Sequence, residues 1–375
     1  MKVTTICGTR PEIIRLSRTM AALDKVVEHT IIHTGQNYDY ELNEIFFEGM
    51  SIRKPDVILN IHASHPAEFV GNAMMLLGYP LETIRPDAVL ILGDTNSAFA
   101  AAYASKRLKI PVFHMESGNR CFDQRVPEEI NRKAVDHLSD INLPYSSIAR
   151  ENLLREGFPA DRIIKTGSPM HEILHYYQSA IFDSRILETL ALSYRDYFVV
   201  SVHREENTIP EKLDEFRGML IALASKYGKR VIVSTHPRLR KELEKSTSDL
   251  YDVMGYQSTL GAISGVEFHK PFGFCDYVKL QQNAICTLSD SGTITEESSL
   301  LGFPALNLRE THERQEGMEE ASVMMSSFHD APERINLAQK MMVVPKDYSA
   351  TNVSDKVVRI ILSYKDYVNR TVWGK

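Results

Sequence analysis

The sequence predicts an α/β protein built from two parallel-sheet domains. Three observations support this prediction. Short apolar runs alternate with helical patterns along most of the chain, 375 residues are too many for one small core, and no segment departs from globular composition. The apolar runs are nearly continuous, as in strands covered by helices on both faces. Hydrophobic residues make up 43% of the chain and charged residues 25%, so a packed core is expected.

The expected strands fall into two groups of five. In the first half they are KVTTIC (2–7), HTIIHT (29–34), AVLILG (88–93), PVFHME (111–116) and DINLPY (140–145). Helical patterns over 12–23, 96–108 and 128–138 separate them. The second half has YFVVSVH (197–203), RVIVSTH (230–236), VEFHKP (266–271), AICTLSD (284–290) and PALNL (304–308). The two halves read as the same architecture twice.

Helical patterns drop out over 166–200, and we place the join between the domains at roughly 170–195. We therefore expect one Rossmann-like domain over 1–175 and a second over 190–350. The final helical pattern, 354–372, follows the last strand and could pack on either domain. Ligands of open parallel sheets bind beyond the carboxyl ends of the strands, so an active site is expected in a cleft between the two sheets.

Composition narrows the class of protein. A net charge of −6 argues against nucleic acid as the main partner, and no apolar run approaches the length that spans a bilayer, so no membrane partner is expected. The sequence enters a strand pattern at once, without a signal-peptide layout. Its four cysteines lack metal-ligand spacing and suit reduced thiols in the cytoplasm (Cys7, Cys121, Cys275 and Cys286).

Two strands of the first half end in polar motifs. GTRPEIIR follows the first strand, and its Arg10 and Arg15 stand near a helix N-terminus, where anions are favoured. An ordinary helix start with exposed arginines explains this motif equally well. GDTNS follows AVLILG, and Asp94 could simply cap the next helix.

The stretch PVFHMESGNRCFDQRVPEEINR gathers many carboxylates and guanidiniums. Glu128 and Glu129 follow Pro127 in an apparent first helical turn, where the helix dipole stabilises acids. That explanation leaves out Glu116, which ends an apolar strand, where acids are unfavourable. Arg132 lies close enough in sequence to hold one of these carboxylates ionised.

The second half offers anion-binding groups at its strand ends. His203 and Arg204 end one strand, and His236 ends the next. AICTL leads to Ser291, Gly292 and Thr293 and then to a helix, a layout that presents backbone amides to a phosphate. Thr293 and Glu296 fit a capping box, which leaves Glu297 as a partner for ribose hydroxyls.

These strand-end groups predict a nucleotide-linked substrate. The sequence has no GxxxxGK[ST], no GxGxxG after a strand and no metal-ligand spacing. ATP hydrolysis, hydride transfer and zinc chemistry are therefore excluded.

The motifs resemble those of the non-hydrolysing UDP-N-acetylglucosamine 2-epimerases. The likeness runs in order from about residue 2 to about residue 320. It rests on GTRPEIIR, HTGQNYDYELNEIFF, LGDTNSAFAAA, HMESGNRCFDQRVPEEINR, HREEN, SDSGTITEE and ETHERQE. The resemblance implies a glycosyltransferase-B-like (GT-B-like) fold, inversion at C2 of a UDP-linked 2-acetamido sugar, no metal or nicotinamide cofactor, and a homodimer.

The resemblance also assigns residues. It implies that Arg10, Asp94, Glu116, Glu128, Arg132 and His203 are active-site residues. It implies that Ser291, Gly292, Glu297 and Arg314 bind UDP, with Tyr277 against the uracil ring. Arg15 departs from the lysine that is frequent in the family, which keeps the charge but changes the geometry.

The form of GNRCFDQRVPEEINR and GTRPEIIRLS resembles the branch that makes UDP-N-acetyl-L-fucosamine for capsule or O-antigen synthesis. A UDP-GlcNAc 2-epimerase is the alternative within the family. Outside it, a GT-B glycosyltransferase, a hydrolysing epimerase and a nucleotide-sugar sensor remain as rivals.

The family reaction eliminates UDP to a 2-acetamidoglycal and adds it back. Cations and amides must stabilise the leaving diphosphate, a role for Arg10, Arg15, His203, Arg204 and residues 291–293. Two titratable groups must flank C2. We expect Glu116 and Asp94 to transfer protons and Glu128 and Arg132 to position the sugar.

Overall fold

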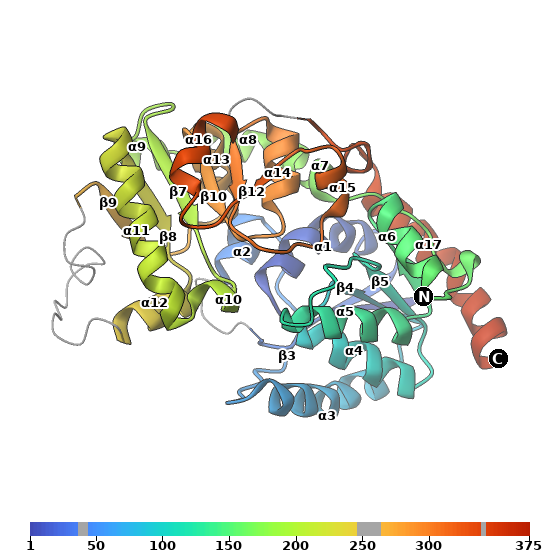
Figure 1. Ribbon diagram of the computed structural model, residues 1–375. Coiled ribbons are helices and arrows are strands. Elements are labelled where there is room, and N and C mark those ends of the chain that lie inside the picture. Colours follow the sequence, from blue (N-terminus) through green and yellow to red (C-terminus); the bar gives the residue numbers. More distant parts are fainter. Residues whose placement is uncertain (37–43, 246–263, 339–342) are drawn as a thin grey trace. The chain divides into compact units, whose positions relative to one another are not determined.

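The computed structural model describes residues 1–36, 44–245, 264–338 and 343–375 (Figure 1). The chain divides into two compact units. Unit 1 comprises Met1–Tyr176 together with Lys346–Lys375, and unit 2 comprises Tyr177–Pro345. The last long helix therefore belongs to unit 1. The predicted second domain, 190–350, has different bounds at both ends.

Unit 1 is built on a parallel sheet with helices on both faces. Its described strands are β1 (Lys2–Cys7), β2 (Glu28–His33), β3 (Val57–Ile58), β4 (Ala88–Leu92), β5 (Val112–Met115) and β6 (Ile141–Leu143). Its described α-helices are α1 (Arg10–Leu23), α2 (Glu44–Gly49), α3 (Pro66–Ile84), α4 (Asn96–Arg107), α5 (Pro127–Leu138), α6 (Ser147–Arg155), α7 (Met170–Tyr176) and α17 (Val353–Val368). Helix α4 packs against both α3 and α5, and α1 packs against α17 (Figure 1).

Unit 2 repeats this plan. Its described strands are β7 (Tyr197–Ser201), β8 (Arg230–Ser234), β9 (Val266–His269), β10 (Thr287–Ser289), β11 (Ala305–Asn307) and β12 (Met324–Met325). Its described helices are α8 (Gln178–Asp183), α9 (Ile186–Thr189), α10 (Glu205–Thr208), α11 (Pro210–Tyr227), α12 (Pro237–Lys245), α13 (Phe274–Asn283), α14 (Ile294–Leu301), α15 (Gln315–Glu319) and α16 (Ala331–Ala338). The predicted parallel, doubly wound sheets are confirmed.

Both sheets have the same strand order. It is β3-β2-β1-β4-β5-β6 in unit 1 and β9-β8-β7-β10-β11-β12 in unit 2, with every pair parallel. In each sheet the first strand lies beside the fourth, with Thr4 opposite Val89 and Val200 opposite Leu288. The strand order reverses at this pair, and ligands of such sheets bind at the reversal. Each unit therefore has one expected binding edge, after β1 and β4 or after β7 and β10.

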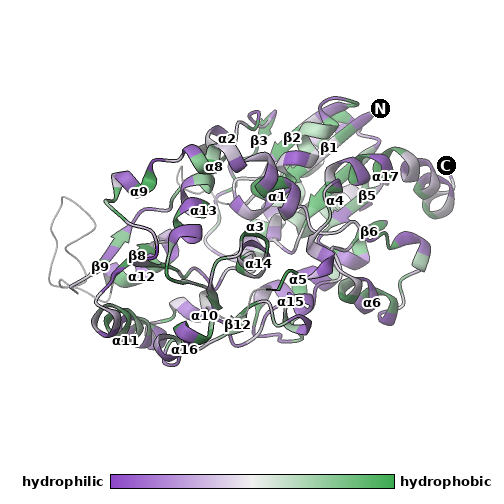
Figure 2. Cartoon of the chain, turned by 90° about the horizontal axis from the view of Figure 1, so that it is seen from above, coloured by the Kyte–Doolittle hydropathy of each residue, from purple (hydrophilic) through white to green (hydrophobic). Residues whose placement is uncertain are grey.

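Apolar burial holds each sheet in place. In unit 1, Ile6, Val89 and Ile91 are fully buried against α3 and α4, and in unit 2, Val200 and Leu288 are fully buried against α11 and α16. Green residues, at the hydrophobic end of the scale, occur in both β1 and β2 in Figure 2. Burying an apolar side chain contributes roughly 1.5–3 kcal/mol, so the strand cores fix the positions of the strand ends.

The structure corrects one expectation about the chain's organisation. Helical patterns were expected to drop out over 166–200, yet α7, α8 and α9 lie in this segment. These helices have only four to seven residues, too short for apolar periodicity to stand out. Within the described residues, no helix is long and apolar enough to cross a membrane.

Candidate active site

The predicted residues of unit 1 gather at one edge of its sheet. Arg10 follows β1, Asp94 follows β4 and Glu116 follows β5, while Glu128 and Arg132 lie on the first turns of α5. The carboxyl ends of parallel strands share an edge, so these side chains come from neighbouring positions. The structure thus brings the carboxylates of unit 1 to the point where the strand order reverses.

Glu116 is held in an unusual conformation by a buried partner. Its φ is +67°, in the left-handed region that non-glycine residues rarely adopt, and its carboxylate is ion-paired with Arg15. The two side chains are only 9% and 5% exposed. Such a conformation costs about 1–3 kcal/mol and tends to occur at functional sites. Arg15 was predicted to bind the substrate anion, but the structure places it on the Glu116 carboxylate.

A buried polar network lies beneath the turn that carries Glu116. The His114 ring lies 3.0 Å from Asp136, which also pairs with Arg120 at 2.7 Å and accepts a hydrogen bond from the Gly118 amide. His114, Arg120 and Asp136 are fully buried. A Cβ on Gly118 would lie 2.2 Å from the carbonyl oxygen of Ala149, so only glycine fits there. Sequence reasoning missed this support, because its members are charged residues whose pairing depends on the fold.

Asp94 is tied to α5. Arg132 donates two hydrogen bonds to one Asp94 oxygen, at 3.0 and 2.7 Å, and a third to Glu129 at 2.8 Å. The cap interpretation of Asp94 is wrong, because Thr95 caps α4 by accepting from the Ala98 amide. Asp94 is instead half-buried and paired with the guanidinium of Arg132.

Glu129 was not singled out by its sequence position but organises the loop before α5. It is fully buried and accepts hydrogen bonds from the amides of Cys121 and Phe122, both at 3.1 Å. Its neighbour Glu128 is half-buried on the same turn. Glu129 therefore holds the loop and Arg132, while Glu128 stands on the less buried side of the turn.

The turn after β1 is tightly packed around Glu12. This buried carboxylate accepts from the amides of Gly8 and Thr9 and from the Thr95 hydroxyl, linking the turns after β1 and β4. Burial raises the pKa of Glu12 to about 7, although these hydrogen bonds act in the opposite direction. The Arg10 guanidinium lies 5.6 Å from the centre of the Phe46 ring. The arginine predicted for anion binding thus begins α1 beside a rigid turn.

In unit 2 the central feature is a histidine paired with a buried acid. His203, just after β7, has its Nδ1 atom 2.8 Å from Asp290, just after β10. Asp290 is fully buried and also accepts from the amides of His203 and Arg204. Burial alone would raise the pKa of Asp290, but His203 and these hydrogen bonds hold that pKa well below its usual range. The His236 ring lies beside that of His203, with ring centres 5.7 Å apart and the ring planes tilted by 43°.

The predicted phosphate cradle lies at the start of α14. The Ser291 and Thr293 hydroxyls are 2.9 Å apart, and Gly292 is packed so closely that a Cβ would lie 2.5 Å from Glu313. The other oxygen of Glu313 pairs with Arg309 at 2.7 Å. Arg204 reaches within 3.6 Å of Glu313. The Glu313 carboxylate, with its cationic partners Arg204 and Arg309, therefore lies beside the turn that was predicted to bind phosphate.

The two acids of α14 have different partners. Glu297 accepts from Gln281 at 3.0 Å, and Glu296 lies 3.4 Å from Arg314. The predicted capping box is wrong, because the Thr293 side chain makes no capping bond and Glu296 is fully buried against Arg314. Tyr277 is half-buried on α13, packed beside the hydrophobic cluster of β7 and β8.

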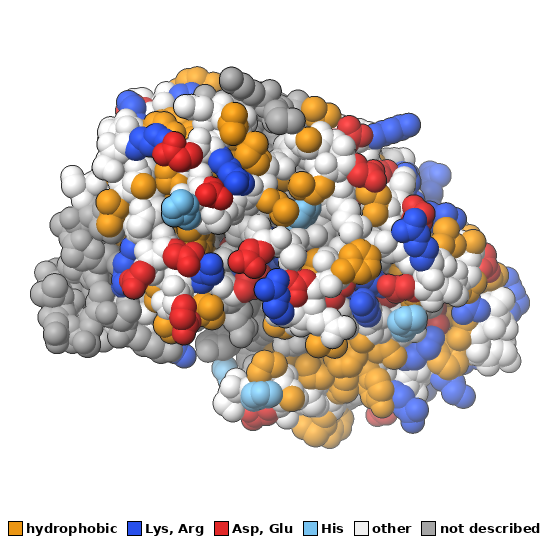
Figure 3. All heavy atoms as spheres, viewed as in Figure 1, with side chains coloured by type: hydrophobic (Ala, Val, Ile, Leu, Met, Phe, Trp, Pro, Cys, Tyr) orange, Lys and Arg blue, Asp and Glu red, His pale blue; other side chains and the backbone are white. Residues whose placement is uncertain are grey.

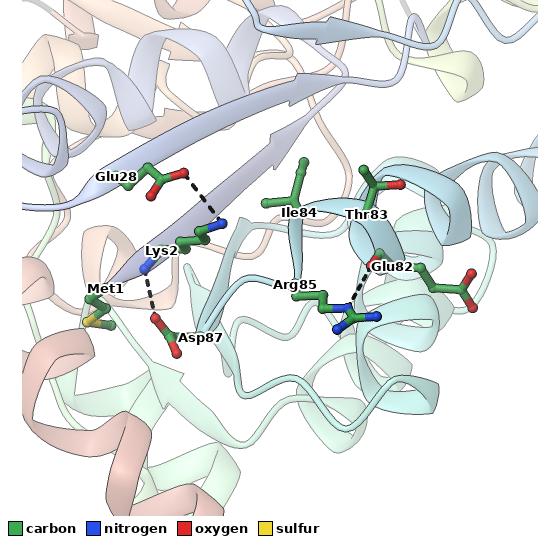
Figure 4. A pocket seen from close by; sticks show the side chains of 8 residues that line it. All are labelled: Met1, Lys2, Glu28, Glu82, Thr83, Ile84, Arg85 and Asp87. Atoms are coloured by element: carbon green, nitrogen blue, oxygen red, sulfur yellow. Dashed lines mark hydrogen bonds and ion pairs between the residues drawn. The ribbon is translucent and has the colours of Figure 1, made fainter.

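A hollow of 580 Å³ lies away from all of these residues (Figure 4). Lys2 and Asp87 place it at the amino-terminal ends of β1 and β4, the edge of the sheet opposite Glu116. Its remaining lining residues are Met1, Glu28, Glu82, Thr83, Ile84 and Arg85. Among the described residues, no group of three or more His, Cys, Asp or Glu side chains could hold a metal ion.

Comparison with known proteins gives one consistent family. Residues 21–362 match the model of the UDP-N-acetylglucosamine 2-epimerase family. A UDP-N-acetylglucosamine 2-epimerase structure from Rickettsia bellii is 47% identical, covers 100% of both chains and gives a TM-score of 0.89. The enzyme from Methanocaldococcus jannaschii, in complex with UDP-GlcNAc and UDP, is 30% identical over 96% of this chain and 99% of that one, with a TM-score of 0.87.

A further relative acts on a different sugar. The UDP-2,3-diacetamido-2,3-dideoxy-D-glucuronate 2-epimerase of Pseudomonas aeruginosa is 33% identical over 84% of each chain. Similar sequences thus serve more than one UDP-linked sugar. The motif HTGQNYDYELNEIFF is only partly visible, since residues 37–43 lie outside the described residues.

Proposed function

We propose a specific reaction for this chain on the basis of its family. The chain belongs to the UDP-N-acetylglucosamine 2-epimerase family, has the GT-B-like fold of that family, and is an isomerase acting at C2 of UDP-linked sugars. The proposed substrate is UDP-2-acetamido-2,6-dideoxy-L-talose and the product is UDP-N-acetyl-L-fucosamine, which serves capsule or O-antigen synthesis. The form of the 118–132 loop and of the turn after β1 supports this choice within the family.

The reaction proceeds by elimination and re-addition of UDP. The bond from C1 to the phosphate oxygen breaks with its electron pair on UDP, and a base takes the C2 proton, so that C1 and C2 become doubly bonded. An acid then delivers a proton to the other face of C2 while the phosphate oxygen attacks C1. Because the C2 hydrogen of the sugar itself is not acidic, losing UDP first or nearly so makes its removal feasible.

Unit 2 holds the UDP in this proposal. The amides of residues 291–293 and the cations Arg204 and Arg314 bind the diphosphate, with His203 at the leaving oxygen. Glu297 takes the ribose hydroxyls and Tyr277 the uracil ring, while His236 adds a donor beside His203. The fixed positions of these groups around β7, β10 and α14 support the assignment.

Unit 1 supplies the proton-transfer groups. Glu116 and Asp94 are the proposed base and acid, Glu128 and Arg132 position the sugar, and Arg10 faces the diphosphate. The single observation that carries this assignment is Glu116, which unit 1 holds in a strained conformation on a buried guanidinium. General acid–base groups contribute about 10²–10⁴-fold to rate, enough to justify such a cost in stability.

A second substrate is favoured by a specific observation. The Rickettsia bellii protein, named for UDP-N-acetylglucosamine, shares 47% of its residues with this chain. UDP-GlcNAc is therefore the alternative substrate, with UDP-ManNAc as its epimer.

A substrate panel tests the proposal. Purified protein is given the 6-deoxy-L-talo sugar or UDP-GlcNAc separately, and the C2 configuration is followed by NMR. We expect turnover of the L-talo substrate to exceed that of UDP-GlcNAc by about 10-fold or more in kcat/KM. The reverse preference would favour the alternative substrate. Release of free UDP, or sugar transfer to an added acceptor, would identify one of the rival enzymes.

We also propose that the protein is a homodimer. Residues 69–81 of α3 carry no charged side chain, and Met75 and Tyr79 on this helix are 59% and 66% exposed. Tyr103 on the neighbouring α4 is 42% exposed, and hydrophobic side chains gather low in Figure 3 over these helices. Large exposed apolar patches mark interaction sites. Light scattering on the wild type and on Tyr79→Glu tests this, with a dimer expected for the first and a monomer for the second.

A further inference from the structure

Asp290 has no assigned role in the proposed reaction, yet it is a buried acid of unit 2 with several hydrogen-bond partners. It is fully buried at the end of β10, directly before the phosphate cradle. One of its oxygens accepts from the amides of His203 and Arg204, at 3.1 and 2.9 Å, and from the side chain of Asn207 at 3.1 Å. The other lies 2.8 Å from the Nδ1 atom of His203.

This arrangement fixes which nitrogen of His203 carries a proton. An ionised carboxylate can only accept hydrogen bonds, so the nitrogen facing Asp290 must be Nδ1–H. Nε2 is then the nitrogen available to a ligand, and the ring is partly exposed, at 22%. Since Asp290 joins β10 to the end of β7, it holds the ring against the strand pair where the strand order reverses.

We propose that Asp290 is a positioning residue that holds His203 as an Nδ1–H imidazole, so that Nε2 can exchange a proton with the leaving diphosphate. As the bond from C1 to oxygen breaks, its electron pair stays on UDP and the Nε2 proton moves to that oxygen, leaving a neutral ring. Re-addition of UDP returns the proton to Nε2. This inference rests on the proposed function.

Asp290→Asn is the informative substitution. Its amide oxygen can keep the bonds from the two backbone amides and Asn207, but its NH₂ group then faces Nδ1 of His203. The neutral ring must then accept at Nδ1 and carry its proton at Nε2. An imidazolium ring would no longer face a carboxylate. The substitution therefore retains the backbone contacts while reversing the tautomer.

NMR of protein labelled with ¹⁵N-histidine measures the tautomer directly. The chain has 13 histidines, and His203→Asn identifies the signal of His203. In the wild type we expect Nδ1 of His203 to stay protonated when the ring is neutral. In Asp290→Asn we expect a bare Nδ1. A bare Nδ1 in the neutral ring of the wild type would overturn the proposal, and this result decides the matter even if Asp290→Asn fails to fold.

A double-mutant comparison separates positioning from structural support. We expect Asp290→Asn to lower kcat by roughly 10- to 100-fold while the Kd for UDP stays within about threefold. The double variant with His203→Asn should be no slower than His203→Asn alone, because Asp290 acts through the ring. If the reductions in kcat of the two single variants instead multiply in the double variant, Asp290 has a merely structural role and the proposal is overturned.

Asp140→Asn is the matched control. Asp140 is also buried, accepts from a strand amide, that of Val112 at 2.9 Å, and pairs with Lys106. Neither of these described partners belongs to the predicted site. We expect its kcat to match the wild type. The tautomer measurement needs no turnover. A wild type that epimerises no UDP sugar would therefore overturn the proposed function while the pairing of Asp290 and His203 stayed testable.

Discussion

The carboxylate of Glu116 is ion-paired with the guanidinium of Arg15, and both side chains are almost completely buried. The pair joins the end of β5 to the second turn of α1, and Glu116 adopts a positive φ to form it. Breaking a buried ion pair by removing one partner is costly, so this geometry is strongly determined. It presents a carboxylate at the end of a strand, next to the strands where ligands of this fold bind.

Glu116→Gln should lower kcat by about 10²-fold or more and leave the affinity for UDP nearly unchanged. The amide keeps the size of the side chain but cannot take a proton from C2. Steady-state kinetics and calorimetric titration with UDP measure the two effects. Glu151→Gln, an exposed carboxylate on α6, is the control and should behave as wild type. Retention of most activity by Glu116→Gln would show that another group is the base.

Glu297→Ala should act mainly on binding. Its carboxylate is nearly buried beside Gln281 at the start of α14, where it is proposed to take ribose hydroxyls. Hydrogen bonds to charged groups contribute about 1.5–3 kcal/mol, so the Kd for UDP should rise roughly 10- to 100-fold. Glu333→Ala, an exposed acid paired with Lys226, should bind UDP normally. An unchanged Kd for Glu297→Ala would remove this residue from the UDP site.

Gly8→Ala should destabilise unit 1. A Cβ at Gly8 would lie 2.1 Å from the Thr34 hydroxyl and 2.2 Å from that of Ser97, which are hydrogen-bonded to each other. Overpacking of this kind costs about 1–3 kcal/mol, measurable by urea unfolding. Gly218→Ala is the control, because no atom of the described residues lies within 4 Å of a Cβ at that position on α11, and alanine should stabilise the helix by about 0.5–1 kcal/mol. Equal stability of the two variants would contradict the packing account.

His33 should make the protein sensitive to mild acid. Burial lowers the pKa of His33 to about 4 in the folded state, so the unfolded chain binds a proton more readily below about 6.5. Stability should therefore fall as the pH drops from about 6.5 to about 4, by up to about 3 kcal/mol. In His33→Asn this part of the pH dependence should vanish, because the Asn side chain does not titrate. Its amide oxygen can still accept the hydrogen bond from the Gly35 amide.

Urea unfolding at several pH values measures this difference. His329→Asn, which removes a ring whose side chain is 92% exposed, should leave the wild-type slope intact. Identical slopes for wild type and His33→Asn would contradict the burial account.

Much of the fold could be predicted from apolar runs. Strands such as β4, which starts at the predicted Ala88, are continuous in hydrophobic residues and fully buried. The two-residue strands β3 and β12 could not be predicted, because a strand that short has no pattern of its own. Helix α3 is apolar on most of its surface, so amphipathic periodicity did not single it out.

The candidate site was predictable only in part, for a similar reason. The position of Glu116 indicated a functional role, because an acid at the end of an apolar strand is unfavourable. The structure gives this acid a buried partner, Arg15. Asp290 and Glu129 gave no such signal, since their meaning comes from contacts with His203 and Arg132. A capping motif can be read from sequence, but the fold decides whether it forms.

Turnover in D₂O, followed by NMR at C2 of the product, tests the central claim most directly. If carboxylates of unit 1 remove and return the C2 proton around loss of UDP, each epimerised sugar carries solvent deuterium at C2, and Glu116→Gln forms such product at least about 10²-fold more slowly. Epimerised product that retains the original hydrogen at C2 would contradict the account.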